Sequence, residues 1–419
     1  MSKWEWKKLG EVCEIHGRIG WQGLTRKEYR SSGDYLLITG INFTDNNTVD
    51  YESCVYVDKE RYVQDQYIQV RENDLLITKD GTLGKLALIA EMPPKPATLN
   101  GGLFVIRNPD NKIYPKFLMY VMKSEPFRKM IRKSITGSTV PHLTQNMLVN
   151  FPIPIPSLSE QRSIVKQLDE KLTKIEKIKT NAETNLKNAK ELFETTLEKE
   201  LNPISRHSER SEESSAELPS GWEWKKMRDV CDVRDGTHDS PKYHKEGYPL
   251  VTSKNLKNGL IDINNVKYIS KEDYDAINKR SKVCIGDILF AMIGTIGNAV
   301  LVTEEPYYAI KNVALFKKSS LINPSFLRYI LNSSFILEKM QQEAKGTTQR
   351  FVGLDYLRSF QIPLPPLSVQ KEIVARLDKL SENVKRLEAN YKQIIANCDE
   401  LKKSILKKTF EGDSRSSRE

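Results

Sequence analysis

The sequence predicts an α+β fold. We expect two similar globular domains separated by two long helices, which pack as an antiparallel coiled coil with a pseudo-two-fold relation. Three observations predict this fold. Motifs recur in the same order in the two halves of the chain, short β-rich runs alternate with turn residues in each copy, and each copy ends in a long amphipathic segment. Because the repeat is far longer than a solenoid unit, it indicates a duplicated pair of domains.

Composition limits the class of protein. At about 100–200 residues per domain, 419 residues indicate two to four domains. No run of 18 apolar residues occurs and residues 1–8 lack an apolar signal core, so we expect no membrane span, no secretion and a cytoplasmic location. Lys and Arg total 65 against 55 Asp and Glu, and the resulting charge of +10 permits a polyanion partner. The five widely spaced cysteines predict reduced thiols.

Three motifs define the repeat. Trp-Glu-Trp-Lys-Lys followed by Val-Cys opens at Trp4 and again at Trp222. Asp-Leu/Ile-Leu followed by a Gly-Thr-x-Gly turn opens at Asp74 and again at Asp287. A Pro-rich segment then closes the globular part of each copy. We therefore expect a globular domain at residues 1–156, a long helix at 157–201, a flexible linker at 202–220, a second globular domain at 221–366 and a long helix at 367–412.

Within the first copy, β-rich runs are expected at residues 35–39, 54–57, 74–78, 85–89 and 103–106, and short helices near 115–123 and 125–133. These strands are too closely spaced for a regular doubly wound sheet, so a compact α+β domain is predicted. The Gly-Thr-x-Gly turns are expected to join two strands, with Gly supplying positive φ.

Both long segments carry an apolar stripe without Pro or Gly. Steps of three and four residues predict a coiled-coil seam in each, interrupted in the first by Lys179 with Ile178 beside it. We expect the two helices to pack antiparallel on each other; the alternative is that each folds back on its own domain. The predicted packing residues are Leu168, Leu172, Ile175, Leu186, Leu377, Val384, Leu387, Tyr391, Ile394 and Leu401.

Sequence signals for catalysis are absent. The chain has no phosphate-binding loop, no Gly-x-Gly-x-x-Gly after a strand, no Asn/Asp-Pro-Pro-aromatic motif and no Gly-x-Ser-x-Gly elbow. Cys231, His238 and His244 match no standard zinc spacing. We therefore expect no catalytic residue, no metal site and no cofactor bound by this chain.

Polar and basic loops are the better signal, since Asn and Lys suit base edges and Lys suits phosphates. The strongest loops are residues 235–243 and 251–259, with a smaller match at 39–44 and a further loop at 345–350. The Trp-Glu-Trp motifs are interpreted as packing anchors instead of base-stacking platforms. The candidate DNA-binding residues are Thr39, Asn42, Lys79, Lys85, Thr237, His238, Ser240, Lys242, Lys254, Asn255, Lys257, Thr347, Thr348, Gln349 and Arg350.

The order of these parts resembles a known family. Two variable α+β domains open with Trp-x-Trp-Lys-Lys and alternate with two similar helices, each introduced by Ile-Pro-x-Pro-x-Leu-Ser-x-Gln, which ends at Gln161 and at Gln370. The chain thereby resembles the specificity subunit of type I restriction–modification systems. The resemblance covers nearly the whole chain, without the linker and residues 413–419, and rests on the duplicated order more than on any single motif.

The resemblance implies a non-catalytic subunit whose target-recognition domains each read half of a bipartite, asymmetric target in double-stranded DNA. It implies that the helices set the gap and dock two methylation subunits that use S-adenosylmethionine, and it allows for restriction subunits that use ATP and magnesium. No base-reading residue is carried over from the family. The alternative reading is a coiled-coil interaction scaffold without sequence-specific DNA binding; an enzyme with an unrecognised site is a third.

Overall fold

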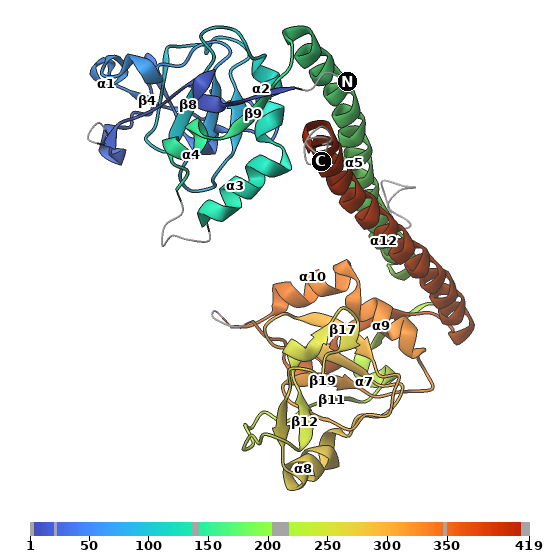
Figure 1. Cartoon of the computed structure of the whole chain (residues 1–419). Coiled ribbons are helices and arrows are strands. Elements are labelled where there is room, and N and C mark those ends of the chain that lie inside the picture. Colours follow the sequence, from blue (N-terminus) through green and yellow to red (C-terminus); the bar gives the residue numbers. More distant parts are fainter. Residues whose placement is uncertain (1–3, 21–22, 136–141, 203–217, 347–349, 412–419) are drawn as a thin grey trace. The chain divides into compact units, whose positions relative to one another are not determined.

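The computed structural model describes residues 4–20, 23–135, 142–202, 218–346 and 350–411 (Figure 1). Most of the predicted linker, residues 203–217, lies outside the described residues. The chain divides into two compact units. Unit 1 comprises Met1–Ala182 and Gln393–Glu419, and unit 2 comprises Glu183–Lys392. Among the described residues, no helix combines the length and the apolar composition that crossing a bilayer requires.

Unit 1 contains an antiparallel four-stranded sheet and a mixed three-stranded sheet, covered by short helices. The predicted runs and the two predicted helices are confirmed within one or two residues. The four-stranded sheet has the order β2 (Glu14–Gly17), β8 (Leu103–Arg107), β5 (Leu75–Thr78) and β6 (Leu86–Leu88). The other has the order β4 (Val55–Val57), β3 (Tyr35–Ile38) and β7 (Ala97–Leu99), and the helices are α1 (Lys59–Val63), α2 (Pro115–Met122), α3 (Glu125–Ile135) and α4 (Gln145–Val149).

Unit 2 repeats this topology strand for strand, which confirms the duplication. Its four-stranded sheet has the order β11 (Val233–Asp235), β19 (Val313–Phe316), β16 (Ile288–Ala291) and β17 (Gly297–Leu301). Its three-stranded sheet has the order β15 (Lys267–Ile269), β12 (Tyr248–Val251) and β18 (Ala309–Ile310), and β13 (Leu256–Lys257) with β14 (Leu260–Ile261) forms an added hairpin. The helices are α7 (Met227–Val230), α8 (Lys271–Ser281), α9 (Pro324–Asn332), α10 (Ser334–Glu343) and α11 (Leu354–Ser359).

The repeated Trp and Pro motifs pair with each other. In unit 1, β1 (Glu5–Lys8) runs antiparallel to β9 (Pro152–Ile155), and in unit 2, β10 (Glu223–Lys226) runs antiparallel to β20 (Gln361–Leu364). Proline is tolerated because each strand of a two-stranded ribbon has a free edge. Trp4 and Trp222 are partly buried against the core of their own unit, as expected for packing anchors, whereas Trp6 is 44% exposed and does not fit that prediction.

A buried glutamine fixes the start of each long helix. In unit 1, Gln161 Oε1 accepts from the Tyr114 backbone N–H at 2.7 Å, and its Nε2 donates to the Pro156 carbonyl at 2.9 Å. In unit 2, Gln370 Oε1 accepts from the Asn323 backbone N–H at 2.7 Å, and its Nε2 donates to the Pro365 carbonyl at 2.8 Å. Each amide therefore ties its long helix to the first turn of α2 or α9.

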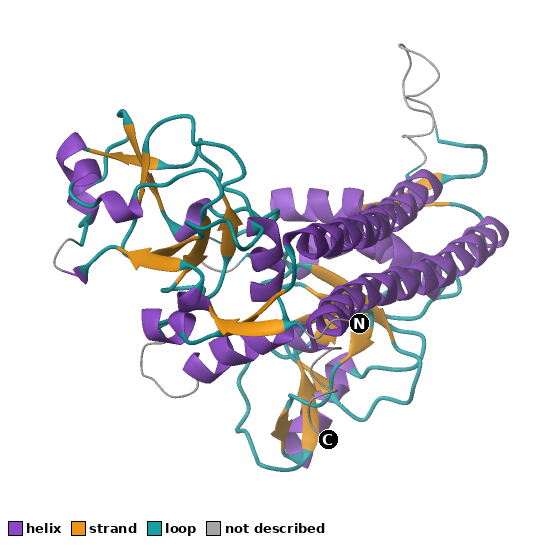
Figure 2. Cartoon of the chain, turned by 45° about the horizontal axis from the view of Figure 1, so that its top comes forward, coloured by secondary structure: helices purple, strands orange, loops and turns teal. Residues whose placement is uncertain are grey.

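The two long helices, α5 (Leu158–Leu201) and α12 (Leu367–Glu411), lie side by side and run antiparallel (Figure 2). In unit 1, Glu176 pairs with Lys402, and Lys179 Nζ lies 2.7 Å from Asp399 Oδ1. In unit 2, Arg376 Nη2 lies 2.7 Å from Glu200 Oε2. The predicted pairing of the two helices is thus confirmed.

The packing residues of α5 are those predicted. On α12, one of the two rows of packing residues differs from the prediction. Leu168, Ile175, Leu377 and Val384 are buried, and Leu172, Leu186 and Tyr391 are partly buried. Lys179 interrupts the apolar seam as predicted: it occupies a seam position, where it is partly buried and paired with Asp399, and Ile178 beside it is 52% exposed.

In α12 the second stripe consists of Ser381, Glu388, Ile395 and Lys402, all partly buried. The predicted Leu387, Ile394 and Leu401 are instead 37%, 37% and 50% exposed, so their assignment to helix packing was wrong. The true seam steps by four and then three residues, which turns the larger side chains outward.

Each core is completed by the far end of the other repeat's helix. The core of unit 1 includes Leu168 near the start of α5 together with Leu406 and Phe410 near the end of α12. The Phe117 and Phe410 rings meet edge to face with centroids 5.7 Å apart. The core of unit 2 likewise joins the start of α12 to Leu197 and Leu201 at the end of α5.

We expect Gln370→Met to lower the free energy of unfolding by about 2 kcal/mol or more, since it leaves a buried N–H and a buried carbonyl without partners. Urea denaturation of the full chain would measure the change. Gln393→Met, at an exposed position of the same helix, is the matched control and should change little. Equal stability of the two variants would contradict the role assigned to Gln370.

Candidate nucleic-acid interface

Two turns with the same Thr–Asn hydrogen bonds contain four of the predicted residues, Thr39, Asn42, Lys254 and Asn255. Asn42 Oδ1 accepts from the Thr39 N–H and hydroxyl, both at 2.8 Å, and Asn255 Oδ1 accepts from the same groups of Thr252, both at 2.9 Å. Both Asn side chains are buried, and their Nδ2 groups donate to nearby carbonyls. Asn42 and Asn255 therefore hold the turn together, and their proposed role in base contact is corrected to a structural one.

The residue before each buried Asn is the exposed one. Ile41 is 89% exposed and Lys254 is also exposed, at equivalent positions of the two turns. Lys254 was predicted from the sequence, whereas Ile41 was not. The two turns share Thr and Asn, which maintain the turn, and differ at the two positions between them; of these, the third position of the turn is exposed in both units, and a difference there is the available signal.

In unit 2 the loop after β11 is held by a small polar network. His238 Nε2 lies 2.7 Å from Asp235 Oδ2, and its Nδ1 lies 2.9 Å from Asn312 Oδ1. Arg280 donates to the other Asp235 oxygen at 3.0 Å. The His238 ring is exposed but positioned on both nitrogens, and it lines a surface cavity of about 620 Å³ with Thr237 and Ser240.

A second cavity of unit 2, of about 320 Å³, brings Lys254 together with two lysines that sequence reasoning missed. Lys267 Nζ lies 4.0 Å from the centre of the Tyr243 ring, and Lys311 Nζ donates to Ser240 Oγ at 2.5 Å. Three lysines and an aromatic ring therefore line one cavity, a combination suited to a polyanion.

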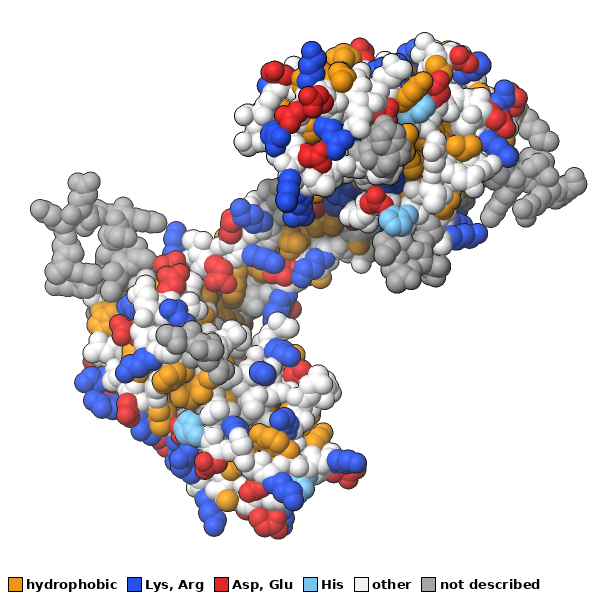
Figure 3. Space-filling model, turned by 90° about the vertical axis from the view of Figure 1, so that its left-hand side faces the viewer, with side chains coloured by type: hydrophobic (Ala, Val, Ile, Leu, Met, Phe, Trp, Pro, Cys, Tyr) orange, Lys and Arg blue, Asp and Glu red, His pale blue; other side chains and the backbone are white. Residues whose placement is uncertain are grey.

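The remaining candidates are more scattered. Lys242 and Arg350 are exposed, and Lys257 Nζ lies 3.6 Å from Asp262 Oδ2. Thr347, Thr348 and Gln349 lie outside the described residues. In the view of Figure 3, lysine and arginine side chains are interspersed with acidic and hydrophobic ones on the face that is shown.

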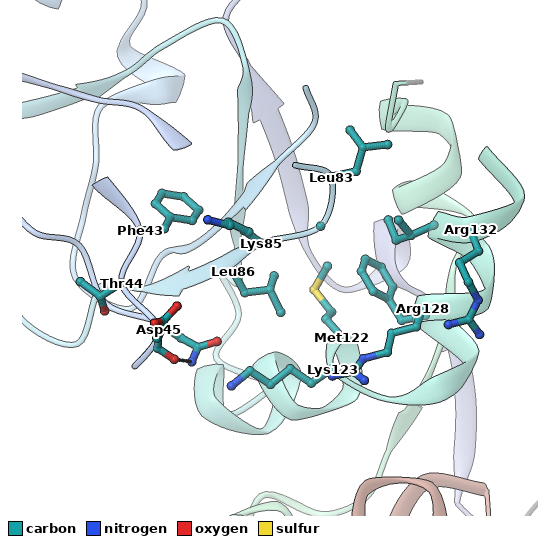
Figure 4. A pocket seen from close by; sticks show the side chains of 14 residues that line it. Phe43, Thr44, Asp45, Leu83, Lys85, Leu86, Met122, Lys123, Arg128 and Arg132 are labelled. Carbon is teal, nitrogen blue, oxygen red and sulfur yellow. Dashed lines mark hydrogen bonds between the residues drawn. The ribbon is translucent and has the colours of Figure 1, made fainter. Parts of the chain in front are cut away.

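In unit 1, Lys79 and Lys85 flank the turn between β5 and β6, where Gly81 and Gly84 have positive φ as predicted. Lys79 Nζ lies 4.7 Å from the centre of the Phe104 ring. Lys85 lines a surface cavity of about 400 Å³ beside α3 (Figure 4). We call it the α3 cavity; its lining includes the cations Lys85, Lys123, Arg128 and Arg132, the carboxylate Asp45, and the apolar Phe43, Leu86, Met122, Phe127 and Ile131.

Lys123 is the most perturbed cation of this cavity. Burial, followed by the charges of Arg128, Lys116 and Lys402, lowers the pKa of Lys123 to about 8. Its Nζ lies 5.7 Å from the centre of the Tyr120 ring, which offers only weak compensation. The folded unit thus keeps a partly buried ammonium among other cations, an arrangement that disfavours the charged form.

The described residues contain no cluster of metal-ligating side chains: no three His, Cys, Asp or Glu side chains there are placed to hold a metal ion. Burial raises the pKa of the Cys13 and Cys231 thiols to about 12, so neither is a ready thiolate. All five cysteines are free, and only Cys284 is exposed.

Comparison with known proteins gives a consistent result. Residues 1–186 and 219–396 match the family model described as type I restriction modification DNA specificity domain. The chain is 25% identical over 358 residues to the Escherichia coli EcoBI specificity subunit of a type I restriction enzyme, covering 82% of this chain and 74% of that protein. It is 24% identical to the Methanocaldococcus jannaschii MjaIX specificity subunit, covering 98% and 94%.

Solved structures share the fold. A chain from a structural study of assembly and conformational transition in the type I restriction–modification system matches with a TM-score of 0.71 and 22% identity, covering 98% of both chains. The HsdS subunit of Thermoanaerobacter tengcongensis matches with a TM-score of 0.60 and 20% identity, covering 98% of this chain and 97% of that one.

We expect Lys123→Met to raise the free energy of unfolding at pH 7 by on the order of 1 kcal/mol, because it keeps the side-chain length but removes a poorly solvated charge. The pKa of Lys123 is about 8 in the folded chain against an ordinary value of 10.5. The unfolded chain therefore binds more protons between these values, and the unmodified chain gains stability as pH rises through this window. Urea denaturation should show the difference between variant and unmodified chain shrinking from pH 7 to pH 10.

Lys129→Met removes a charge from an exposed neighbouring position of α3 and should leave stability nearly unchanged at both pH values. A Lys123→Met chain less stable than the unmodified one at pH 7 would show that the ammonium is favourably placed.

Proposed function

Because the chain belongs to the type I restriction–modification DNA specificity family, it is a specificity subunit and not itself an enzyme, and we propose that its two units each read one half of a bipartite target in double-stranded DNA. The family assignment favours this role over an interaction scaffold without DNA recognition. A steep fall of duplex affinity with salt is expected, since lysines and arginines would release counterions from phosphates.

The observation that carries this proposal is that two units of identical topology have different exposed loops. The strand orders match throughout, whereas the exposed turn residue is Ile41 in unit 1 and Lys254 in unit 2. Unit 2 also has the β13–β14 hairpin and the lysines around Tyr243. Since direct readout depends on the side chains that reach base edges, unlike loops imply unlike half-targets and an asymmetric site.

We further propose that the helix pair sets the spacing between half-targets and that methylation subunits dock on it. Leu387, Ile394 and Leu401 recur every seven residues on one face of α12 and are turned away from α5. An exposed apolar stripe beside a well-packed seam is typical of a surface that another protein covers. In this proposal one face of α12 packs on α5 and another face binds a methylation subunit.

The chemistry is proposed to reside in the partners. The methylation subunits would use S-adenosylmethionine, and a restriction subunit, where one joins, would use ATP and magnesium. The specificity subunit would bind none of these, and the complex would act on DNA in the cytoplasm.

Exchange of residues 9–151, which lie between the ribbon strands β1 and β9, for those of another family member should change one half of the methylated target only. The ribbon, the buried glutamines and both long helices stay in place in this exchange. Methylation-aware sequencing of cells that carry the chimera and its methylation subunits would give the target. A change in both halves would argue against independent reading.

The double variant Ile394→Glu and Leu401→Glu should reduce assembly with methylation subunits by at least tenfold in affinity, because two charges would be desolvated in the interface. Ala389→Glu with Ala396→Glu is the matched control, as it adds the same charge at the same spacing on another exposed face of α12. Analytical ultracentrifugation of the mixed subunits measures assembly, and thermal denaturation checks folding. If both double variants lose the same affinity for the methylation subunits, the stripe of Leu387, Ile394 and Leu401 is not the docking surface.

A further inference from the structure

The α3 cavity is lined by more cations than carboxylates, and the nearest other acidic side chains of unit 1, Asp169 and Glu125, act on Lys123 and Arg128 only through space. Among the described residues, Lys85, Lys123 and Arg128 form no ion pair, although Asp45 lines the same cavity (Figure 4). Lys123 and Arg128 come from successive elements, the end of α2 and the first turn of α3, and Lys85 comes from the start of β6. Three separate segments therefore bring positive charge to one hollow of the surface.

Unit 2 shows that the fold does not need these cations. Asn332 occupies the position equivalent to Lys123, as the following serines show: Ser124 Oγ and Ser333 Oγ donate to the carbonyls of Val121 and Ile330, at 2.5 and 2.6 Å. The Asn332 side chain donates to the Ala299 carbonyl at 2.9 Å and accepts from its N–H at 2.8 Å. In unit 2 this position is thus closed onto strand β17 by a neutral amide.

The following helix differs in the same way. In α3 the positions after the turn include Arg128, Lys129, Arg132 and Lys133, whereas the equivalent positions of α10 are Leu337, Glu338, Gln341 and Gln342. Leu337 packs against the core of unit 2, at the place where unit 1 has Arg128. Unit 1 therefore has a basic helix beside an open cavity, whereas in unit 2 the equivalent positions hold Asn332, bonded to strand β17, and Leu337, packed on the core.

Burial and neighbouring cations disfavour the charged form of Lys123, and unit 2 has a neutral side chain, Asn332, at the same position of the same fold. Retention of the cation cluster is explained if an anion completes it. Lysine and arginine contact phosphate oxygens more often than any other group of DNA, and charge-assisted bonds to phosphate are among the stronger hydrogen bonds. The apolar floor of Phe43, Met122 and Phe127 would strengthen such contacts by excluding water.

We propose that the α3 cavity binds one phosphodiester group of the DNA backbone through Lys85, Lys123 and Arg128, and that the equivalent position of unit 2 binds none. This inference rests on the proposed DNA recognition. It adds that, at this position, unit 1 binds the DNA backbone more strongly than unit 2.

The test uses the full chain assembled with its methylation subunits and a duplex that contains its target. Lys123→Met and Arg128→Gln should each weaken duplex binding by about tenfold near 0.15 M salt. The double variant should flatten the plot of log affinity against log salt by about 0.9, as expected for one lost phosphate contact. Fluorescence anisotropy at several salt concentrations provides both values.

Lys129→Gln removes the same charge from an exposed position of α3 outside the cavity and should have a smaller effect on both. If Lys129→Gln and Arg128→Gln weaken binding equally, the cavity has no special part in it and the inference fails. Failure of the unmodified complex to prefer its target over random duplex would instead overturn the proposed function.

A scan with single methylphosphonates, which remove the charge of one phosphate at a time, locates the contact. One position in the half-target read by unit 1 should weaken binding of the unmodified complex and have no further effect on the double variant. The inference is overturned if the position at which the double variant shows no further effect lies in the half-target of unit 2. It is also overturned if no such position exists. Inorganic phosphate that stabilises the unmodified chain but not the double variant, without such coupling, would assign the cavity to a free anion and also overturn it.

Discussion

The apolar seam between α5 and α12 is the interaction on which the rest of the structure depends. Neither globular core closes within its own repeat, because unit 1 needs Leu406 and Phe410 from the last helix and unit 2 needs Leu197 and Leu201 from the central one. The ion pairs of Lys179 with Asp399 and Arg376 with Glu200 fix the register of that seam. A charged residue in the seam is tolerated here because its partner lies directly across from it.

Much of the fold could be predicted from the sequence, since it depends on order and periodicity. The strands of unit 1, the paired helices and the positive φ of the turn glycines all follow from local patterns. The stripe of Leu387, Ile394 and Leu401 could not, because α12 has two apolar faces and hydrophobicity alone does not say which one meets α5. The residues of α12 in the seam include Ser381, Glu388 and Lys402, which the pattern of apolar residues does not predict.

The candidate site was harder to predict for a related reason. Asn42 and Asn255 have the chemistry of base recognition, but the same amide is equally suited to closing a turn, and burial decides between the two roles. Lys267 and Lys311 lie outside the selected loops, and only folding of unit 2 brings them into one cavity with Lys254. In unit 1, folding likewise brings Lys123 into one cavity with Lys85. Comparing the two units is more informative than either alone, since Asn332 shows which features of Lys123 the fold does not require.

The shared cores also have a consequence for biosynthesis. The globular part of unit 1 is synthesised long before residues 405–410. The first domain to be made is therefore the last whose hydrophobic core is completed. Until then its apolar surface around Phe117 stays open to chaperones and proteases. The core of unit 2 needs only the start of α12, so synthesis of the end of α12 would complete unit 1 after unit 2, and shorter nascent fragments would not contain a fully folded first domain.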